Sequence, residues 1–175
     1  MTGPQISWLP DGRRLHMNHG PIDLIAEAWG DADEVRLAYE QAALRFETIL
    51  TELVGELGVL RSPVSSIIPP LLTSPIARRM FQAVVPYAEQ FITPMAAVAG
   101  AVADEMLAAM VAGQNLAKAY VNDGGDIALY VSPGESLTLA IAGAGNGFGD
   151  RLTIRHDDPI RGVATSGWRG RSFSL

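Results

Sequence analysis

The stretch "VNDGGDIALY", residues 121–130, carries the sharpest structural signal in the chain. Its centre, residues 122–125, consists of an asparagine, an aspartate and two glycines, which readily adopt the positive φ angles of a tight turn. Apolar residues flank this turn on both sides, so the segment predicts a β-hairpin. The turn does not require an acid at Asp126, the first residue of the returning strand. Asp126 is therefore a candidate for function.

Outward from this hairpin, the chain after Gly113 is rich in short β-type runs separated by turns. The segment "GAGNGFGD", residues 143–150, has the glycine content of a dinucleotide-binding loop. That fingerprint must open a helix, whereas "RLTIR", residues 151–155, continues as a strand. We therefore expect a flexible loop between strands and no Rossmann site. The expected strands are residues 116–121, 126–131, 137–142, 152–155 and 160–165.

An earlier β-hairpin is predicted at "RRLHMNHGPIDLIAEAW", residues 13–29, where two alternating runs flank a turn at residues 18–21. His16 and His19 are three residues apart, so on a strand they point to opposite faces. A shared metal site is therefore not expected. The third histidine, His156, has acids beside it and is expected in a solvated turn.

From Asp31 the apolar residues recur with the period of a helix. Asp31 is expected to cap a long amphipathic helix that ends at Gly58. The charged residues lie mostly off its apolar stripe, and we interpret them as a solvated face rather than a site. The stripe consists of Val35, Tyr39, Ala42, Phe46, Ile49, Leu53 and Leu57, and the charged residues are Glu34, Arg36, Glu40, Arg45 and Glu47.

Prolines at positions 63, 69, 70 and 75 predict a connector between two subregions over residues 61–75. Ser74 and Pro75 predict the cap and first turn of a second helix, which ends or kinks near Pro86. Thr93 and Pro94 repeat this start signal.

The third helix continues through "MAAVAGAVADEMLAAMVAG", residues 95–113. The small residues at its start let another backbone, or a flat ligand, approach closely. Close packing of the helix on a sheet is the favoured interpretation of the two. Asp104 interrupts the apolar stretch and argues against a membrane-spanning helix.

Composition limits the classes of function. A chain of 175 residues, with 48% hydrophobic and 18% charged residues, can bury the core of one domain. Its formal net charge of −6 disfavours nucleic acid. The absence of cysteine excludes disulfides and thiolate chemistry and fits the cytoplasm. The N-terminus does not resemble a secretory signal, and no run reaches the roughly 20 apolar residues of a membrane span.

The segment "RGVATSGWRGRSFSL", residues 161–175, follows a predicted strand with two hydroxyls, a glycine and several arginines. Backbone amides, hydroxyls and guanidinium groups together can form a phosphate cradle. The alternative is a set of solvated arginines in a terminal loop. The arginines are Arg161, Arg169 and Arg171.

Four segments follow one another across nearly the whole chain: "RRLHMNHGPIDLIAEAWG", "MAAVAGAVAD", "VNDGGDIALY" and "GVATSGWRGRSFS". The segments "MAAVAGAVAD" and "VNDGGDIALY", and the "GVATSG" at the start of the last segment, resemble segments of the ApbE-like superfamily. The best-known members of that superfamily are FAD:protein FMN transferases, once called thiamine biosynthesis lipoproteins. The first and the last resemble most closely a poorly characterised branch of that superfamily with no established reaction.

The resemblance implies an α+β fold, with a mostly antiparallel sheet packed against long helices, in a single domain over residues 1–175. It also implies binding of FAD, FMN or a related nucleotide, with magnesium assisting cleavage of the pyrophosphate as FMN passes to a Ser or Thr hydroxyl of a target protein. No metal ligand is assigned to this chain. The residues implied to bind the ligand are Ala97, Gly100, Gly124, Gly125, Asp126, Ala164, Thr165, Ser166, Gly167 and Arg169.

The chain departs from the transferase pattern at two places. The transferases carry a lysine at the start of the small-residue helix, whereas residues 98–101 are Val, Ala, Gly and Ala. The superfamily pattern also continues beyond Leu175 into a stretch that supplies magnesium ligands. We therefore expect a C-terminally incomplete version of the pattern.

Three functions follow as hypotheses. The first is a magnesium-dependent enzyme similar to the FMN transferases, and the second is a noncatalytic domain that binds a flavin or other phosphate-bearing ligand, or is purely structural. The third, a hydrolase using Ser166 and His156, lacks support in the spacing of these residues. The terminal strand and the small-residue helix also favour self-association, with a homodimer as the expected state.

Overall fold

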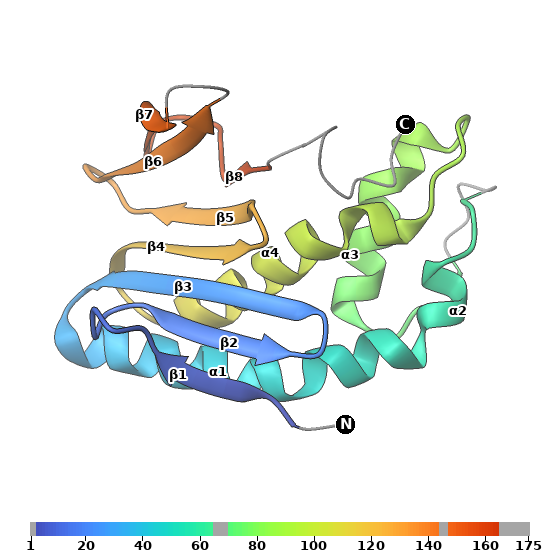
Figure 1. The fold of residues 1–175 in the computed structure, drawn as a ribbon, viewed down its shortest axis with the longest axis horizontal. Helices are drawn as coiled ribbons and strands as arrows, with labels where there is room; N and C mark the ends of the chain where they lie inside the picture. The colour runs from blue at the N-terminus through green and yellow to red at the C-terminus, as the bar shows by residue number, and fades with distance from the viewer. Residues whose placement is uncertain (1–2, 65–69, 144–146, 165–175) are drawn as a thin grey trace.

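The computed structural model describes residues 3–64, 70–143 and 147–164 (Figure 1). Within them the fold is α+β, as expected. Helices pack on one face of a six-stranded antiparallel sheet, and a separate two-stranded hairpin contributes a second, smaller core.

The large sheet has the strand order β1-β2-β3-β4-β5-β8, and every neighbouring pair is antiparallel. The predicted turn at residues 18–21 joins β2 to β3, with His19 opposite Ile22 and a φ of 60° at Gly20. The predicted turn at 122–125 joins β4 to β5. The strands are β1 (Gln5–Trp8), β2 (Leu15–His19), β3 (Ile22–Gly30), β4 (Leu116–Asp123), β5 (Asp126–Val131) and β8 (Gly162–Val163).

The long helix α1 spans Ala32–Gly55, and Asp31 caps it by accepting a hydrogen bond from the backbone N–H of Asp33. The predicted end at Gly58 is wrong. The helix breaks at Glu56, whose backbone N–H bonds to the last carbonyls, and the short helix α2 (Leu57–Leu60) then includes Gly58. Most of the predicted stripe is buried, with Phe46 and Ile49 fully enclosed.

The second predicted helix is α3 (Pro75–Val84), capped by Ser74 and followed by a 3-10 turn, η1 (Val85–Tyr87). The described residues between α2 and α3 lie in neither a helix nor a strand. The third helix begins later than predicted. Pro94–Ala97 form a 3-10 turn, η2, at which the Thr93 side chain makes no capping hydrogen bond, and α4 spans Val98–Val111.

The main core lies between the sheet and helices α1, α3 and α4. In α4 the small side chains of Ala101 and Ala103 are buried, which gives the close packing that the sequence favours. Residues Pro94–Val111 are also apolar enough, by length and composition, to cross a membrane. Core helices of soluble proteins pass the same test, and 39% of this stretch is buried, so the finding is weak.

The second core lies where the hairpin of β6 (Ser136–Gly143) and β7 (Gly147–Arg155) meets β5. Its buried residues are Leu129, Val131, Leu137 and Ile154. The loop predicted for residues 143–150 is wrong at both ends, since Gly143 closes β6 opposite Gly147, which opens β7. A strand, not a helix, follows the glycines, which agrees with the rejected Rossmann site.

Candidate functional site

The β4–β5 turn is a tight hairpin built by two glycines. Asp123 lies opposite Asp126 in the register, and Gly124 and Gly125 between them have φ angles of 61° and 107°. The side chain of Asn122 accepts a hydrogen bond of 2.8 Å from the backbone N–H of Gly125. Local sequence therefore fixes this turn, as in other glycine-rich hairpins.

The turn lies beside the first turn of α4. A hydrogen bond from the backbone of Gly100 reaches the carboxylate of Asp126, and a Cβ added to Gly100 would lie 3.8 Å from Asp126 Oδ2. Ala97, the residue before α4, provides no side-chain cap. Asp126 thus places a carboxylate near the positive end of the helix dipole. This contact gives Asp126 a structural role, independent of any ligand.

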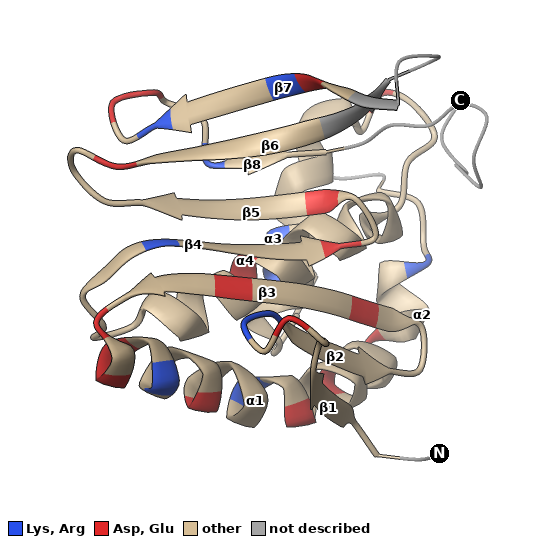
Figure 2. Ribbon diagram, turned by 60° about the vertical axis from the view of Figure 1, so that its left-hand side comes forward, with Lys and Arg blue, Asp and Glu red and all other residues tan. Residues whose placement is uncertain are grey.

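Two carboxylates crowd this end of the sheet. Burial raises the pKa of Asp123 to about 7, and the nearby charges of Asp126 and Asp23 act in the same direction, against a hydrogen bond from the Asp23 backbone. Burial also raises the pKa of Asp126, against the hydrogen bond from Gly100. Figure 2 shows acidic positions at the same end of β3, β4 and β5. Within the described part of the chain, neither Asp123 nor Asp126 forms an ion pair.

Strand β8, the last described strand, leads toward the β4–β5 turn. Val163 of β8 pairs with Ile127 and Gly162 with Ala128, so the register carries Ala164 toward Asp126. A Cβ at Gly162 would lie 3.3 Å from the Ile127 carbonyl oxygen, which shows how closely the two backbones approach. The other residues implied on this segment, Thr165, Ser166, Gly167 and Arg169, lie outside the described residues.

The structure thus brings Ala97, Gly100, Asp126 and Ala164 to one end of the sheet, although they are far apart in the sequence. Gly124 and Gly125 lie at the same turn but line a concavity of about 380 Å³, together with His16 and Asp23. Asp126 does not line that concavity. The residues implied to form one pocket therefore divide between the concavity and the α4 side of the turn.

Sequence reasoning missed His16 and Asp23 as neighbours of the glycine turn. Their side chains are in contact between strands β2 and β3, with His16 Nε2 beside Asp23 Oδ1. The register of the predicted first hairpin carries the signal, because a turn at 18–21 places residues 16 and 23 close together. His19 is buried on the opposite face against Phe46, as the strand alternation predicts.

His156 is half-buried, and its Nδ1 lies 2.8 Å from the Val131 carbonyl oxygen. It lies in the turn after β7, as predicted, and its ring is held by the backbone. No group of three or more His, Asp or Glu side chains that suits a metal ion occurs in residues 3–64, 70–143 and 147–164.

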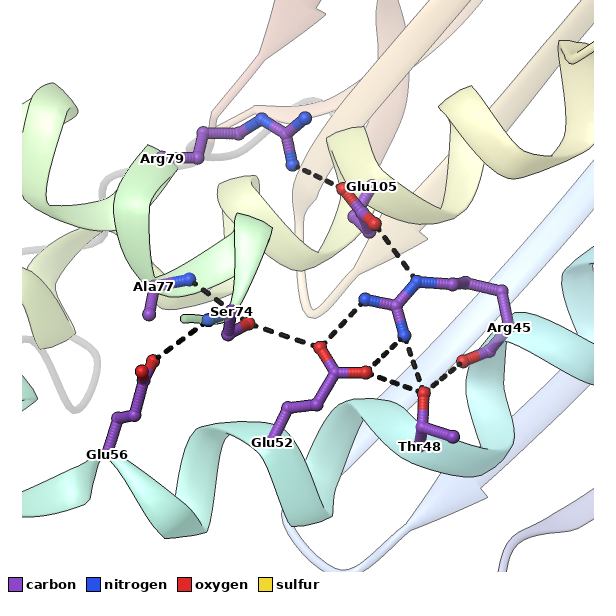
Figure 3. Close-up of polar contacts among 8 residues, drawn as sticks. All are labelled: Arg45, Thr48, Glu52, Glu56, Ser74, Ala77, Arg79 and Glu105. Carbon is purple, nitrogen blue, oxygen red and sulfur yellow. Dashed lines mark hydrogen bonds and ion pairs between the residues drawn. The ribbon is translucent and has the colours of Figure 1, made fainter. Parts of the chain in front are cut away.

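A second polar cluster joins three helices and corrects the interpretation of α1. Arg45 is only 19% exposed and does not belong to a solvated face. Its Nη1 and Nη2 donate to both carboxylate oxygens of Glu52 at 2.7 and 2.9 Å, and its Nε donates to Glu105 of α4 at 3.0 Å (Figure 3). Arg79 of α3 donates to the other oxygen of Glu105 at 2.9 Å, and Ser74 Oγ donates to Glu52.

We call Arg45, Glu52, Glu105, Arg79 and Ser74 the Arg45 cluster. A concavity of about 370 Å³ adjoins it, but its carboxylates already have cationic partners. The sequence signal for it was the spacing of Arg45 and Glu52, which are two helical turns apart on one face of α1. We therefore interpret the Arg45 cluster as a set of ion pairs that joins the helices, not as a ligand site.

A family model described as "AbpE bacteria" matches residues 6–175, nearly the whole chain. No curated protein matches the chain.

Proposed function

This chain belongs to the family described as AbpE bacteria, and from that premise we propose that it binds a flavin or nucleotide-type ligand at the β4–β5 turn. FAD is the proposed ligand for testing, with FMN as the smaller alternative. The proposed binding residues are those on the turn, on the first turn of α4 and on the segment that follows β8.

One observation carries the proposal: Asp126 is next to Gly100 at the turn to which β8 also leads. Small residues keep the backbone open on both sides, since Gly124 has nothing within 4 Å of an added Cβ and Gly100 has only the Asp126 oxygen at 3.8 Å. The concavity of about 380 Å³ that Gly124 and Gly125 line, although Asp126 does not, lies within the range of small-molecule clefts, about 300–1,000 Å³.

We include magnesium in the proposal for a reason of charge. The two crowded carboxylates repel a phosphate group, so a phosphate-bearing ligand requires a cation between its phosphates and the carboxylates. Magnesium is commonly held by one or two carboxylates together with substrate phosphates, rather than by a complete set of protein ligands. Asp123 and Asp126 supply hard oxygen donors without a cationic partner among the described residues, which fits that role. When bound, the ion would neutralise charge on the ligand's phosphates.

The test is a calorimetric titration of the purified chain with FAD, with and without magnesium. We expect saturable binding that requires magnesium. Asp126→Asn keeps an acceptor for the Gly100 N–H but removes the charge, so it should weaken magnesium-dependent binding at least tenfold. Glu47→Ala, at an exposed position on α1, is the matched control and should bind as the parent chain does. Equal binding by the parent chain and Asp126→Asn would refute the site.

The second candidate is binding without catalysis. Residues 98–101 provide no lysine at the start of α4, which favours a domain that holds the ligand and leaves its pyrophosphate intact. In the transferase reaction, a new bond forms between a target hydroxyl oxygen and the FMN phosphorus, the pyrophosphate bond breaks, and AMP leaves. Release of AMP from FAD in the presence of magnesium and a Ser- or Thr-containing target distinguishes the two candidates. A cytoplasmic location and a homodimer remain predictions, the second testable by light scattering.

A further inference from the structure

Another cavity lies at the opposite end of β3 from the glycine turn. The pairing of β2 with β3 ends at Leu15 and Ala26, whereas β3 continues beside β4 as far as Gly30. The last four residues of β3 therefore lack a strand on their β2 side. A cavity of about 520 Å³ occupies this gap, between the β1–β2 hairpin and the first half of α1. We call it the edge cavity.

A hydrogen-bonded tyrosine fixes the wall of the edge cavity. Tyr39 Oη accepts a 3.0 Å hydrogen bond from the backbone N–H of Ala28, on the open edge of β3, and donates one of 2.7 Å to the Arg13 carbonyl oxygen. Trp8 packs edge-on against this ring, with centroids 4.9 Å apart. Trp29 also lines the cavity, so its lining is mainly aromatic and aliphatic.

One buried carboxylate oxygen in this lining has no hydrogen bond from the described residues. Glu27 is 6% exposed, and its Oε1 has no hydrogen-bond partner among the described residues. The nearest cation, Arg13, holds its Nε 3.7 Å from Oε1, too far for a hydrogen bond, and its own side chain is 71% exposed. The other oxygen, Oε2, accepts a 3.4 Å hydrogen bond from the Tyr120 hydroxyl.

The remaining charges of the lining are already paired at its rim. Arg36 donates to Glu40 at 2.7 Å, and both side chains are more than half exposed. Glu27 has only a long ion pair with Arg13, so its Oε1 still lacks a hydrogen-bond donor among the described residues. A buried carboxylate oxygen without a donor is costly, and a ligand that supplies the donor removes this cost.

We propose that the edge cavity binds a small amphipathic amine, with its apolar or aromatic body between Trp8, Trp29 and Tyr39 and its ammonium group donating to Glu27 Oε1. The Trp8 and Tyr39 rings add cation–π attraction for the same charge, whereas the Trp29 ring already has Lys118 Nζ 5.5 Å from its centroid. The size of the cavity lies within the range of small-molecule sites. This site is separate from the β4–β5 turn and does not rest on the function proposed there.

The test uses 4-phenylbutylamine as the probe and 4-phenylbutyrate as its anionic counterpart, titrated calorimetrically into the full chain. We expect saturable binding of the amine and at least tenfold weaker binding of the acid. No saturable binding of the amine up to millimolar concentration, or equal binding of the two probes, would overturn the proposal. Stronger binding of 4-phenylbutyrate would overturn it in favour of an anion site at Arg13 and Arg36.

Two variants test the role of Glu27. Glu27→Gln should weaken amine binding at least tenfold and leave the binding of 4-phenylbutyrate no weaker, with thermal unfolding as the check on folding. Arg13→Ala removes the competing cation at an exposed position, so it should tighten amine binding severalfold, with thermal unfolding again as the check on folding. Unchanged amine affinity in either variant would contradict the proposal. Asp126→Asn, at the glycine turn, should bind the amine as the parent chain does.

Discussion

The Arg45 cluster and the β4–β5 turn both place carboxylates in partly buried positions, but with opposite electrostatic results. Hydrogen bonds from Arg45 lower the pKa of Glu52. Burial opposes ionisation of Glu105, yet hydrogen bonds from Arg79 and Arg45 outweigh it and lower its pKa as well. At the turn, burial raises the pKa of both Asp123 and Asp126.

The difference between the two regions is the presence of a cation supplied by the chain. In the Arg45 cluster each carboxylate is neutralised by an arginine, and the interactions are used to join α1, α3 and α4. At the turn, the described residues provide backbone hydrogen bonds but no cationic partner. The comparison teaches that burial of an acid does not by itself indicate function, whereas burial without a counter-charge does.

The largest expected effect is on the Arg45 cluster. Arg45→Met should lower the free energy of unfolding by about 3 kcal/mol, because it leaves the partly buried Glu52 without a cation and Glu105 with Arg79 alone. Urea unfolding measures this change. The matched control is Arg36→Met, which breaks exposed ion pairs on the same helix and should cost under about 0.5 kcal/mol. Similar losses in both variants would place Arg45 on a solvated face after all.

The next effect is a pH dependence at the turn. The folded chain holds a proton on Asp123 up to a pKa of about 7, whereas the unfolded chain releases it near the ordinary value of 3.8. The folded state therefore binds more protons in this window, and stability falls as pH rises from about 4 to about 7. The full shift corresponds to about 4 kcal/mol, which solvent access to the side chain reduces to about 2 kcal/mol.

Asp123→Asn should remove this pH dependence, because the amide does not titrate. Urea unfolding at pH 5 and pH 8 should show a smaller loss of stability in the variant than in the parent chain. Asp33→Asn, at an exposed position in the first turn of α1, is the control and should keep the parent's pH profile. Parallel profiles for the parent chain and Asp123→Asn would contradict the electrostatic difference between the two regions.

The smallest effect concerns the contact between α4 and the turn. Gly100→Ala should raise stability by about 0.5–1 kcal/mol, since alanine is the better helix former and its Cβ meets only an ordinary contact with Asp126. The added methyl group also narrows the space beside the turn, so FAD binding should weaken severalfold. Thermal unfolding and calorimetry measure the two changes. Weaker binding together with lower stability would indicate disruption of α4 rather than a blocked site.

Local signals in the sequence predicted much of the fold. The turns at 18–21 and 122–125, the Asp31 cap and the Ser74 cap all depend on residues close together in the chain, and all are confirmed. The later start of α4 was missed because a Thr-Pro start signal does not distinguish a 3-10 turn from the first turn of an α-helix.

The candidate site was less predictable, for a physical reason. The contact between Gly100 and Asp126 links a helix to a hairpin across the fold, and no spacing in the sequence encodes it. The Arg45 cluster was misread because a helical wheel treats α1 alone, whereas Glu105 and Arg79 arrive from other helices. The unpaired edge of β3 was also not predicted, because it depends on where the pairing with β2 ends.

The most direct test of the central claim is the pKa of Asp123, measured by NMR titration of its carboxyl carbon with and without magnesium and FAD. The free chain should give a value of about 7. Saturation with both ligands should lower this pKa markedly, because a bound cation favours the ionised carboxylate. A pKa near 7 that does not change under saturating magnesium and FAD would contradict the assignment of this turn as the ligand site.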